Sequence, residues 1–147
     1  MRSRVKVMHG VNFSALDRRE PDHYGTLSLA ELERGVKRFA DELGLGEPNF
    51  FQSNHEGDFC EALHNAREMA DALLLNPGAW THYSWAIRDA LAVSGLPAVE
   101  VHLSAVSQRE EWRRHSVISD LCVGTVEGKG LDGYRDALAL LKAALEA

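Results

Sequence analysis

Apolar residues along the chain fall into two patterns, short continuous runs and longer stretches with helical spacing. Five short runs predict β-strands, at residues 5–8, 49–53, 72–76, 98–103 and 121–126. The run at 72–76 ends at Pro77 and Gly78, a profile typical of a central parallel strand that is buried on both faces. The chain therefore carries the strands of one sheet.

Helical spacing dominates the segments between these runs. Ser28 and Glu31 form a capping-box pattern, and the apolar positions that follow predict a helix closed by Gly44. The same spacing predicts further helices at residues 56–69, 81–93 and 131–145. Strands and helices alternate, apart from a longer connection at 104–120. The pattern therefore predicts an α/β fold, a flavodoxin-like doubly wound five-stranded parallel sheet with helices on both faces.

Residues 9–27 form a connection with no sustained apolar periodicity. Gly10, Asp17, Pro21 and Gly25 interrupt it, and its centre is rich in charge. Connections of this length without regular structure are uncommon inside compact domains, where they tend to be lids or binding segments. The segment is therefore a candidate for ligand contact.

Composition narrows the classes of protein to consider. A chain of 147 residues with 45% apolar and 26% charged positions fits a single domain over residues 1–147. Its net charge of -6 provides no attractive field for nucleic acid, so no nucleic-acid partner is expected. Residues 1–10 hold too short an apolar run for a signal peptide or a membrane span, which indicates a cytoplasmic protein with no membrane partner. Cys60 and Cys122 form no CxxC pair and are expected to be reduced and packed.

Ligands of doubly wound sheets collect at the carboxyl ends of the strands. Polar and titratable residues follow the first, third and fourth predicted strands of this chain. They are Asn12, Arg18, Arg19, Glu20, His23, Tyr24, Asn76, His82, Glu100, His102, Ser104, Arg109, Arg113 and His115. The sequence therefore predicts a polar ligand site along this edge of the sheet.

Tyr24 is a candidate general base within the connection that follows the first strand. A phenol has a reference pKa of about 10 and is a poor base near neutral pH unless a cation favours the phenolate. Arg18 or Arg19, on the same segment, would supply that charge. The alternative is that Tyr24 is an ordinary loop tyrosine, and spacing alone does not separate the two interpretations.

Glu100 and His102 form a second candidate pair. They stand two residues apart on a predicted strand, so both side chains project from the same face of the sheet. A carboxylate in that position orients the imidazole and favours its protonated form, which makes His102 a candidate general acid for a leaving hydroxyl group. A strand-end histidine with a purely structural role is the alternative.

Other kinds of site have less support. The seven histidines include no HExxH or comparable pair, so no metal is expected. The glycines of GTVEGKG match neither the P-loop nor the GxGxxG pattern of nucleotide sites. Arg109, Arg113 and Arg114 form a basic cluster that Glu110 and Glu111 interrupt. Such a cluster fits either a solvated turn or the capture of a small anionic or polyhydroxylated ligand.

Four separated blocks of sequence resemble the type II dehydroquinases along nearly the whole chain. In order, they are GVN followed by RREPxxYG, then NPGAxTHxSxAIRDAL, then EVHLS, and last REExRRHS. The resemblance implies a lyase, a 3-dehydroquinate dehydratase that forms 3-dehydroshikimate by anti elimination through an enolate, in the shikimate or quinate pathway. It implies no cofactor, and it implies trimers that pack into a dodecamer.

The same resemblance gives roles to residues of this chain. Tyr24 would remove the proton next to the ketone with the help of Arg19, and Asn12 would stabilise the enolate. His102, held by Glu100, would protonate the departing hydroxyl group. The residues expected to bind substrate are Asn76, His82, Leu103, Ser104, Arg113 and, in a neighbouring subunit's site, Asp89.

The chain departs from the family pattern at several positions. His9 and Val11 stand where asparagine and proline are usual, Asp17 replaces a glycine, and Ala105 stands where asparagine is common. The changes in the first block are expected to alter how the base is held, with Asp17 competing with Tyr24 for the arginine charge. They leave open the alternative of a non-catalytic relative that binds a cyclic polyol acid. A flavin or nucleotide binder is a further alternative that rests on fold analogy alone.

Overall fold

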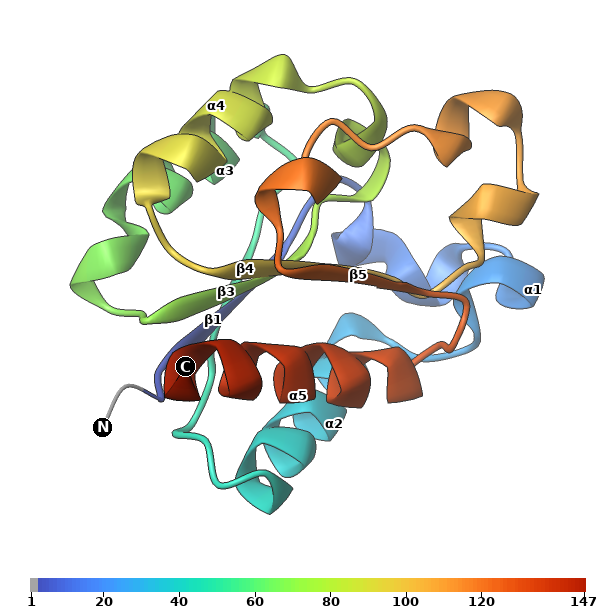
Figure 1. The fold of residues 1–147 in the computed structure, drawn as a ribbon. Coiled ribbons are helices and arrows are strands. Elements are labelled where there is room, and N and C mark those ends of the chain that lie inside the picture. The colour runs from blue at the N-terminus through green and yellow to red at the C-terminus, as the bar shows by residue number, and fades with distance from the viewer. Residues whose placement is uncertain (1–2) are drawn as a thin grey trace.

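The five predicted strands form one parallel sheet (Figure 1). The computed structural model describes residues 3–147, so Met1 and Arg2 at the start of the N-terminal segment lie outside the described residues. The strands are β1 (Val5–His9), β2 (Asn49–Gln52), β3 (Ala72–Asn76), β4 (Ala98–His102) and β5 (Gly124–Glu127). Every pair is parallel, and the order is β2-β1-β3-β4-β5, as in flavodoxin-like folds. The predicted fold class is therefore confirmed.

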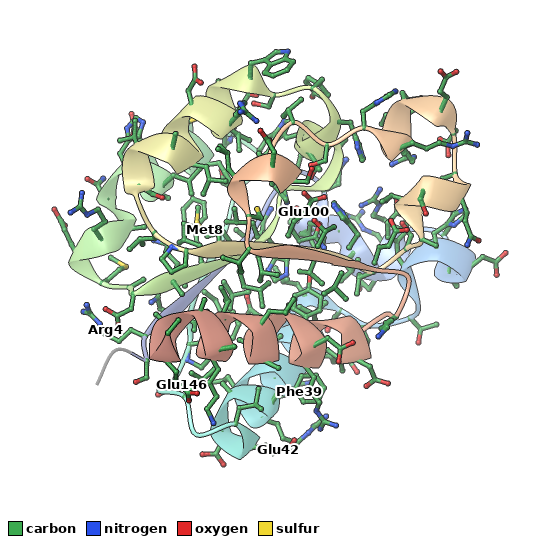
Figure 2. All side chains as sticks on the ribbon, in the orientation of Figure 1. Arg4, Met8, Phe39, Glu42, Glu100 and Glu146 are labelled. Atoms are coloured by element: carbon green, nitrogen blue, oxygen red, sulfur yellow. The ribbon has the colours of Figure 1, made fainter. Side chains whose placement is uncertain are left out.

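Two helices cover each face of the sheet (Figure 1). They are, on one face, α2 (Leu29–Glu42) and α5 (Asp132–Glu146), and on the other α3 (Glu56–Asn65) and α4 (Trp85–Ser94). Met8 belongs to the core beneath α3 and α4, whereas Phe39 belongs to the core beneath α2 and α5 (Figure 2). Side chains of one strand point to both faces in turn, which explains why β3 is a continuous apolar run.

Helix α2 begins and ends as its sequence predicts. The Ser28 hydroxyl accepts a hydrogen bond from the Glu31 amide, and the Glu31 carboxylate accepts one from the Ser28 amide, both at 3.1 Å. The helix ends just before Gly44, whose φ of 74° lies in the left-handed region that glycine tolerates. The predicted capping box is therefore confirmed.

Two other elements start later than predicted. The helix expected at 81–93 begins at Trp85, because the Ser84 hydroxyl caps its first turn and the preceding residues form a 3-10 turn. The strand expected at 121–126 begins at Gly124, after a second 3-10 turn. The turn at Gly78–His82 holds buried Trp80 and Thr81, whereas the turn at Ser119–Leu121 is exposed although Leu121 is apolar.

The connection after β1 is folded rather than irregular. Residues 10–27, called the lid segment below, contain a 3-10 helix at Phe13–Arg18 and the one-turn helix α1 at Pro21–Tyr24. Phe13 and Leu16 are buried in the core beneath α2 and α5. These two apolar side chains anchor the segment and hold its polar residues at the carboxyl edge of the sheet.

Candidate active site

A cleft opens at the carboxyl ends of β3 and β4. Its walls come from the lid segment, from the ends of the two strands, and from the connections that follow them. The lining residues are Phe13, Arg19, Tyr24, Asn76, Gly78, Ala79, His82, His102, Leu103, Ser104 and Arg113. Most of the predicted site residues therefore meet in one cleft, although they come from distant parts of the sequence.

Glycine allows two walls of the cleft to meet. A Cβ atom at Gly10 would lie 2.1 Å from the Pro77 carbonyl oxygen, and one at Gly78 would lie 2.8 Å from the Val11 carbonyl oxygen. Any larger residue would force the backbones apart, and Gly78 also has a φ of 69°. The turns after β1 and β3 therefore pack directly against each other at the base of the lid segment.

Tyr24 is hydrogen-bonded to two guanidinium groups. Arg19 Nη2 and Arg109 Nη1 each donate to Tyr24 Oη at 2.7 Å. The guanidinium carbon of Arg19 also lies 3.8 Å from the centroid of the phenol ring. Both donors are cationic, so the phenol oxygen is held by two charge-assisted hydrogen bonds. The arrangement suits an oxygen that accepts a proton.

Arg109 is the residue of this cluster whose contact with Tyr24 the sequence does not predict. The sequence offers Arg18 or Arg19 as the cation, and of these Arg19 makes the contact while Arg18 is exposed. Arg109 was part of the polar edge, but it is 85 residues from Tyr24 in the sequence. Among residues 3–147, Asp17 is exposed and forms no ion pair with either lid arginine, so the expected competition for charge is not seen.

Glu100 lies behind His102 on β4. Its Oε2 is 2.6 Å from His102 Nε2, and its Oε1 accepts a hydrogen bond from the Ser116 hydroxyl at 2.7 Å. Both side chains of the pair are at most 5% exposed. Glu100 points to the face of the sheet that α3 and α4 cover (Figure 2). The carboxylate therefore fixes the rotation of the His102 imidazole. His102 lines the cleft, whereas Glu100 does not.

His82 presents one ring nitrogen to the cleft. Its Nδ1 lies 2.7 Å from the His115 carbonyl oxygen and donates to it, which leaves Nε2 as the acceptor of a neutral ring. Burial lowers the pKa of His82, and His102 and Arg113 lower it further. The His115 carbonyl and the Glu100 carboxylate act in the opposite direction. The ring stacks on His102 with 6.2 Å between centroids. His82 is therefore suited to accept a hydrogen bond from a ligand hydroxyl group.

Asn76 is linked to the core below the cleft. Its Nδ2 donates to Tyr134 Oη at 3.1 Å, and the same oxygen lies 2.9 Å from His9 Nε2. His9 is fully buried and packs against Phe13, with 4.7 Å between the ring centroids. The sequence predicts that His9 alters how the base on the lid is held. The structure instead places its hydrogen bond on Tyr134 and not on Tyr24.

Replacing His9 with leucine is expected to flatten the dependence of stability on pH between about 6.5 and 3. Burial lowers the pKa of His9 from 6.5 to about 3 in the folded protein. In this window the unfolded chain binds a proton that the folded chain does not. The free energy of unfolding of the wild type therefore falls, by up to about 1.4 kcal/mol per pH unit, as the pH decreases.

Urea unfolding at several pH values across this window measures the slope. The exposed His64 supplies a matched control, since His64→Leu should keep the wild-type slope. An equally steep slope in the His9→Leu variant would contradict the burial of a neutral imidazole at this position.

Besides Glu100, two predicted catalytic or substrate-binding residues lie outside the lining of the cleft. Asn12 is exposed and has a φ of 73°, and its amide donates to Asn54 Oδ1 at 2.8 Å. Asn54 also donates to the Ser14 hydroxyl at 3.0 Å, so it ties the start of the lid segment to the end of β2. Asp89 is exposed on α4. The described chain alone therefore does not bring either side chain to the cleft.

Residues 3–147 hold no cluster of three or more histidine, cysteine or carboxylate side chains that is placed to bind a metal ion. Over the same range, no helix combines the length and apolar content needed to cross a membrane.

Cys60 and Cys122 are half-buried free thiols. Burial raises the pKa of both, that of Cys122 to about 12, so neither thiol is a ready nucleophile.

Comparisons with known proteins point to one family. The family described as Dehydroquinase class II matches residues 3–142. A relative from Bacillus pumilus, named 3-dehydroquinate dehydratase, is 48% identical over 135 residues, which span 92% of this chain and 91% of the relative. The resemblance of the four sequence blocks is therefore confirmed.

Solved structures agree with this match. The crystal structure of type II dehydroquinase from Butyrivibrio crossotus has a TM-score of 0.90 and 38% identity, covering 96% of this chain and 98% of that one. The type II dehydroquinase from Propionibacterium acnes has a TM-score of 0.89 and 38% identity, covering 97% of this chain and 98% of that one. The similarity thus extends over the sheet, its helices and the lid segment.

Proposed function

The chain belongs to the class II dehydroquinase family, and from this premise we propose that it removes water from 3-dehydroquinate to form 3-dehydroshikimate. One observation carries the proposal. A single cleft is lined by a phenol that two guanidinium groups contact and by an imidazole that a carboxylate contacts. Loss of water from a hydroxy-ketone needs a base for the proton and an acid for the leaving hydroxyl group. The cleft offers a candidate for each.

In the first step, Tyr24 Oη takes a proton from the carbon next to the ketone. The electron pair of the broken C–H bond moves onto the ketone oxygen and gives an enolate. Arg19 and Arg109 hold the oxygen that accepts the proton, since each donates to it at 2.7 Å. Asn12 is proposed to stabilise the enolate through a bridging water, which suits an exposed side chain whose backbone is fixed by Asn54.

In the second step, the enolate collapses and forms the carbon–carbon double bond. The C–O bond to the neighbouring hydroxyl group breaks, and His102 supplies the proton that completes the water molecule. Glu100 supports this role because its carboxylate lies 2.6 Å from the imidazole and orients it. We propose that the base and the acid act from opposite faces of the substrate, which makes the elimination anti.

The remaining polar residues of the cleft are proposed to bind the substrate. Arg113 is suited to the carboxylate, because a guanidinium group pairs with it through two parallel hydrogen bonds. Asn76, His82 and Ser104 are suited to hydroxyl groups, and Leu103 supplies apolar contact beside them. No cofactor or metal takes part in these steps.

We also propose that the enzyme is a homo-oligomer, a dodecamer built from trimers, and that it is located in the cytoplasm. Asp89 would then reach into the site of a neighbouring subunit. Tyr83 and Trp85 support this proposal, since they are 57% and 65% exposed beside the same helix as Asp89. Light scattering tests it, and a monomer at micromolar concentration would contradict it.

The direct test of the proposed reaction follows the ultraviolet absorbance of the conjugated enone product. Purified protein mixed with 3-dehydroquinate should raise this absorbance at a rate proportional to protein concentration. Binding measured by calorimetry without any rise in absorbance would instead favour the non-catalytic relative that binds a cyclic polyol acid. Absence of both binding and turnover would refute the proposal.

Replacing either arginine that contacts Tyr24 is expected to lower kcat. Removal of one charged hydrogen bond costs about 1.5–3 kcal/mol, so Arg19→Ala and Arg109→Ala should each reduce kcat roughly 10- to 100-fold. The exposed Arg18 is the matched control, and Arg18→Ala should keep near wild-type kcat. Equal rates for all three variants would show that the guanidinium contacts do not assist the phenol.

A further inference from the structure

Beneath the cleft, Asn76 is linked by hydrogen bonds to two buried side chains, Tyr134 and His9, to which the proposed mechanism gives no role. His9 Nε2 lies 2.9 Å from Tyr134 Oη, and Asn76 Nδ2 donates to the same oxygen at 3.1 Å. His9 and Tyr134 are completely buried, and Asn76 is 2% exposed. Of the three, Asn76 is the one that lines the cleft.

The available partners decide the direction that we assign to each hydrogen bond. An amide nitrogen only donates, so Tyr134 Oη accepts from Asn76. We assign the Tyr134 hydrogen to His9 Nε2, because in the opposite direction both this hydrogen and the His9 Nδ1 lone pair would lack a partner among the described residues. His9 Nε2 is then the acceptor, and the imidazole carries its hydrogen on Nδ1, for which the described residues offer no partner. On the other side, the Gly78 amide donates to Asn76 Oδ1 at 3.4 Å. The Asn76 amide is therefore held at both its nitrogen and its oxygen.

A contribution to stability does not by itself explain why the core holds these three hydrogen-bonded side chains. Tyr134 lies in the apolar core beneath α2 and α5, and His9 packs against Phe13. A buried nitrogen without a hydrogen-bond partner costs free energy that an apolar side chain of similar size avoids. What distinguishes this set of hydrogen-bonded side chains is that its last member, Asn76, is a polar group at the wall of the cleft.

We propose that His9 and Tyr134 are positioning residues that set the orientation of the Asn76 amide toward the substrate. The inference rests on the proposed function, in which Asn76 binds a substrate hydroxyl group. An amide that rotates by 180° exchanges its acceptor for its donor. A fixed amide presents one defined acceptor and one defined donor, and so selects polyols whose hydroxyl groups match that pattern.

The Tyr134→Phe variant tests this role, because it removes the hydroxyl group and keeps the ring. The Asn76 amide then loses its acceptor, and we expect KM for 3-dehydroquinate to rise about 10-fold with kcat within about threefold of wild type. Ala137→Gly, in the same helix, controls for lower stability and should leave KM unchanged. Thermal unfolding establishes that both variants are folded in the assay. An unchanged KM in folded Tyr134→Phe would overturn the proposal.

A double-mutant cycle separates positioning from general damage to the core. In an Asn76→Ala background, adding Tyr134→Phe is expected to change KM by less than about twofold, because the residue through which it acts is gone. Equal effects of Tyr134→Phe in the two backgrounds would overturn the proposal.

Nitrogen NMR of protein labelled at histidine gives a readout that does not depend on turnover. We expect His9 in the wild type to be neutral, with its hydrogen on Nδ1, and its Nε2 signal to shift when Tyr134→Phe removes the donor. A hydrogen on Nε2 would reverse the chain and overturn the inference. If the wild type binds 3-dehydroquinate but does not convert it, the proposed function fails. The same variants are then compared by their Kd for 3-dehydroquinate in place of KM, and this comparison decides the inference.

Discussion

Replacement of Tyr24 with phenylalanine is expected to reduce kcat for the dehydration of 3-dehydroquinate by about 10⁴-fold, at the upper end of what a general base contributes. The substitution removes a single oxygen atom, and that oxygen is the one to which both Arg19 and Arg109 donate. The ring still fills its buried position, so the lid segment should keep its packing. The loss is expected in kcat because the phenol acts on the proton during the reaction.

The enone assay and thermal unfolding measure this loss and the stability of the variant. The matched control is Tyr83→Phe, since Tyr83 is exposed and lies outside the cleft lining. It should retain the kcat of the wild type. A folded Tyr24→Phe variant that keeps more than about a tenth of wild-type kcat would contradict the role of the phenol as base.

Replacement of His102 with alanine is expected to reduce kcat by about 10³-fold. The hydroxyl group must then leave without a proton donor, and Glu100 is left as a buried carboxylate that keeps only its bond from Ser116. That uncompensated charge is also expected to lower the free energy of unfolding. The thermal midpoint of the variant should therefore fall together with its rate.

The exposed His64 again supplies the control, and His64→Ala should change neither the rate nor the thermal midpoint. The Glu100→Gln variant measures the contribution of the Glu100 charge separately from that of the His102 imidazole, because the glutamine keeps a hydrogen-bonding group beside His102 without the charge. We expect Glu100→Gln to fall between wild type and His102→Ala in kcat. Wild-type turnover by His102→Ala would remove this residue from the acid role.

Local patterns in the sequence were sufficient to predict most of the fold. The strand at 72–76 was recognisable because it is buried on both faces, and α2 because Ser28 and Glu31 cap it. The start of α4 at Trp85 was missed because the preceding 3-10 turn contains buried Trp80 and therefore extends the apolar pattern. Boundaries set by tertiary packing do not appear in a local pattern.

The site was predictable where its residues follow a strand directly. His102 and Asn76 stand at strand ends, so the parallel sheet brings them to one edge. The pairing of Arg109 with Tyr24 depends on how the connection after β4 folds back over the lid segment, which no spacing reveals. The contact of His9 was equally hidden, because its partner Tyr134 comes from the last helix.

The central claim is that Tyr24 removes the proton and that His102 then releases the hydroxyl group. NMR of 3-dehydroquinate in deuterated water measures exchange of the hydrogen next to the ketone separately from product formation. We predict that His102→Ala replaces this hydrogen with deuterium faster than it forms product, whereas Tyr24→Phe catalyses neither process. Exchange at the wild-type rate in Tyr24→Phe would contradict the account.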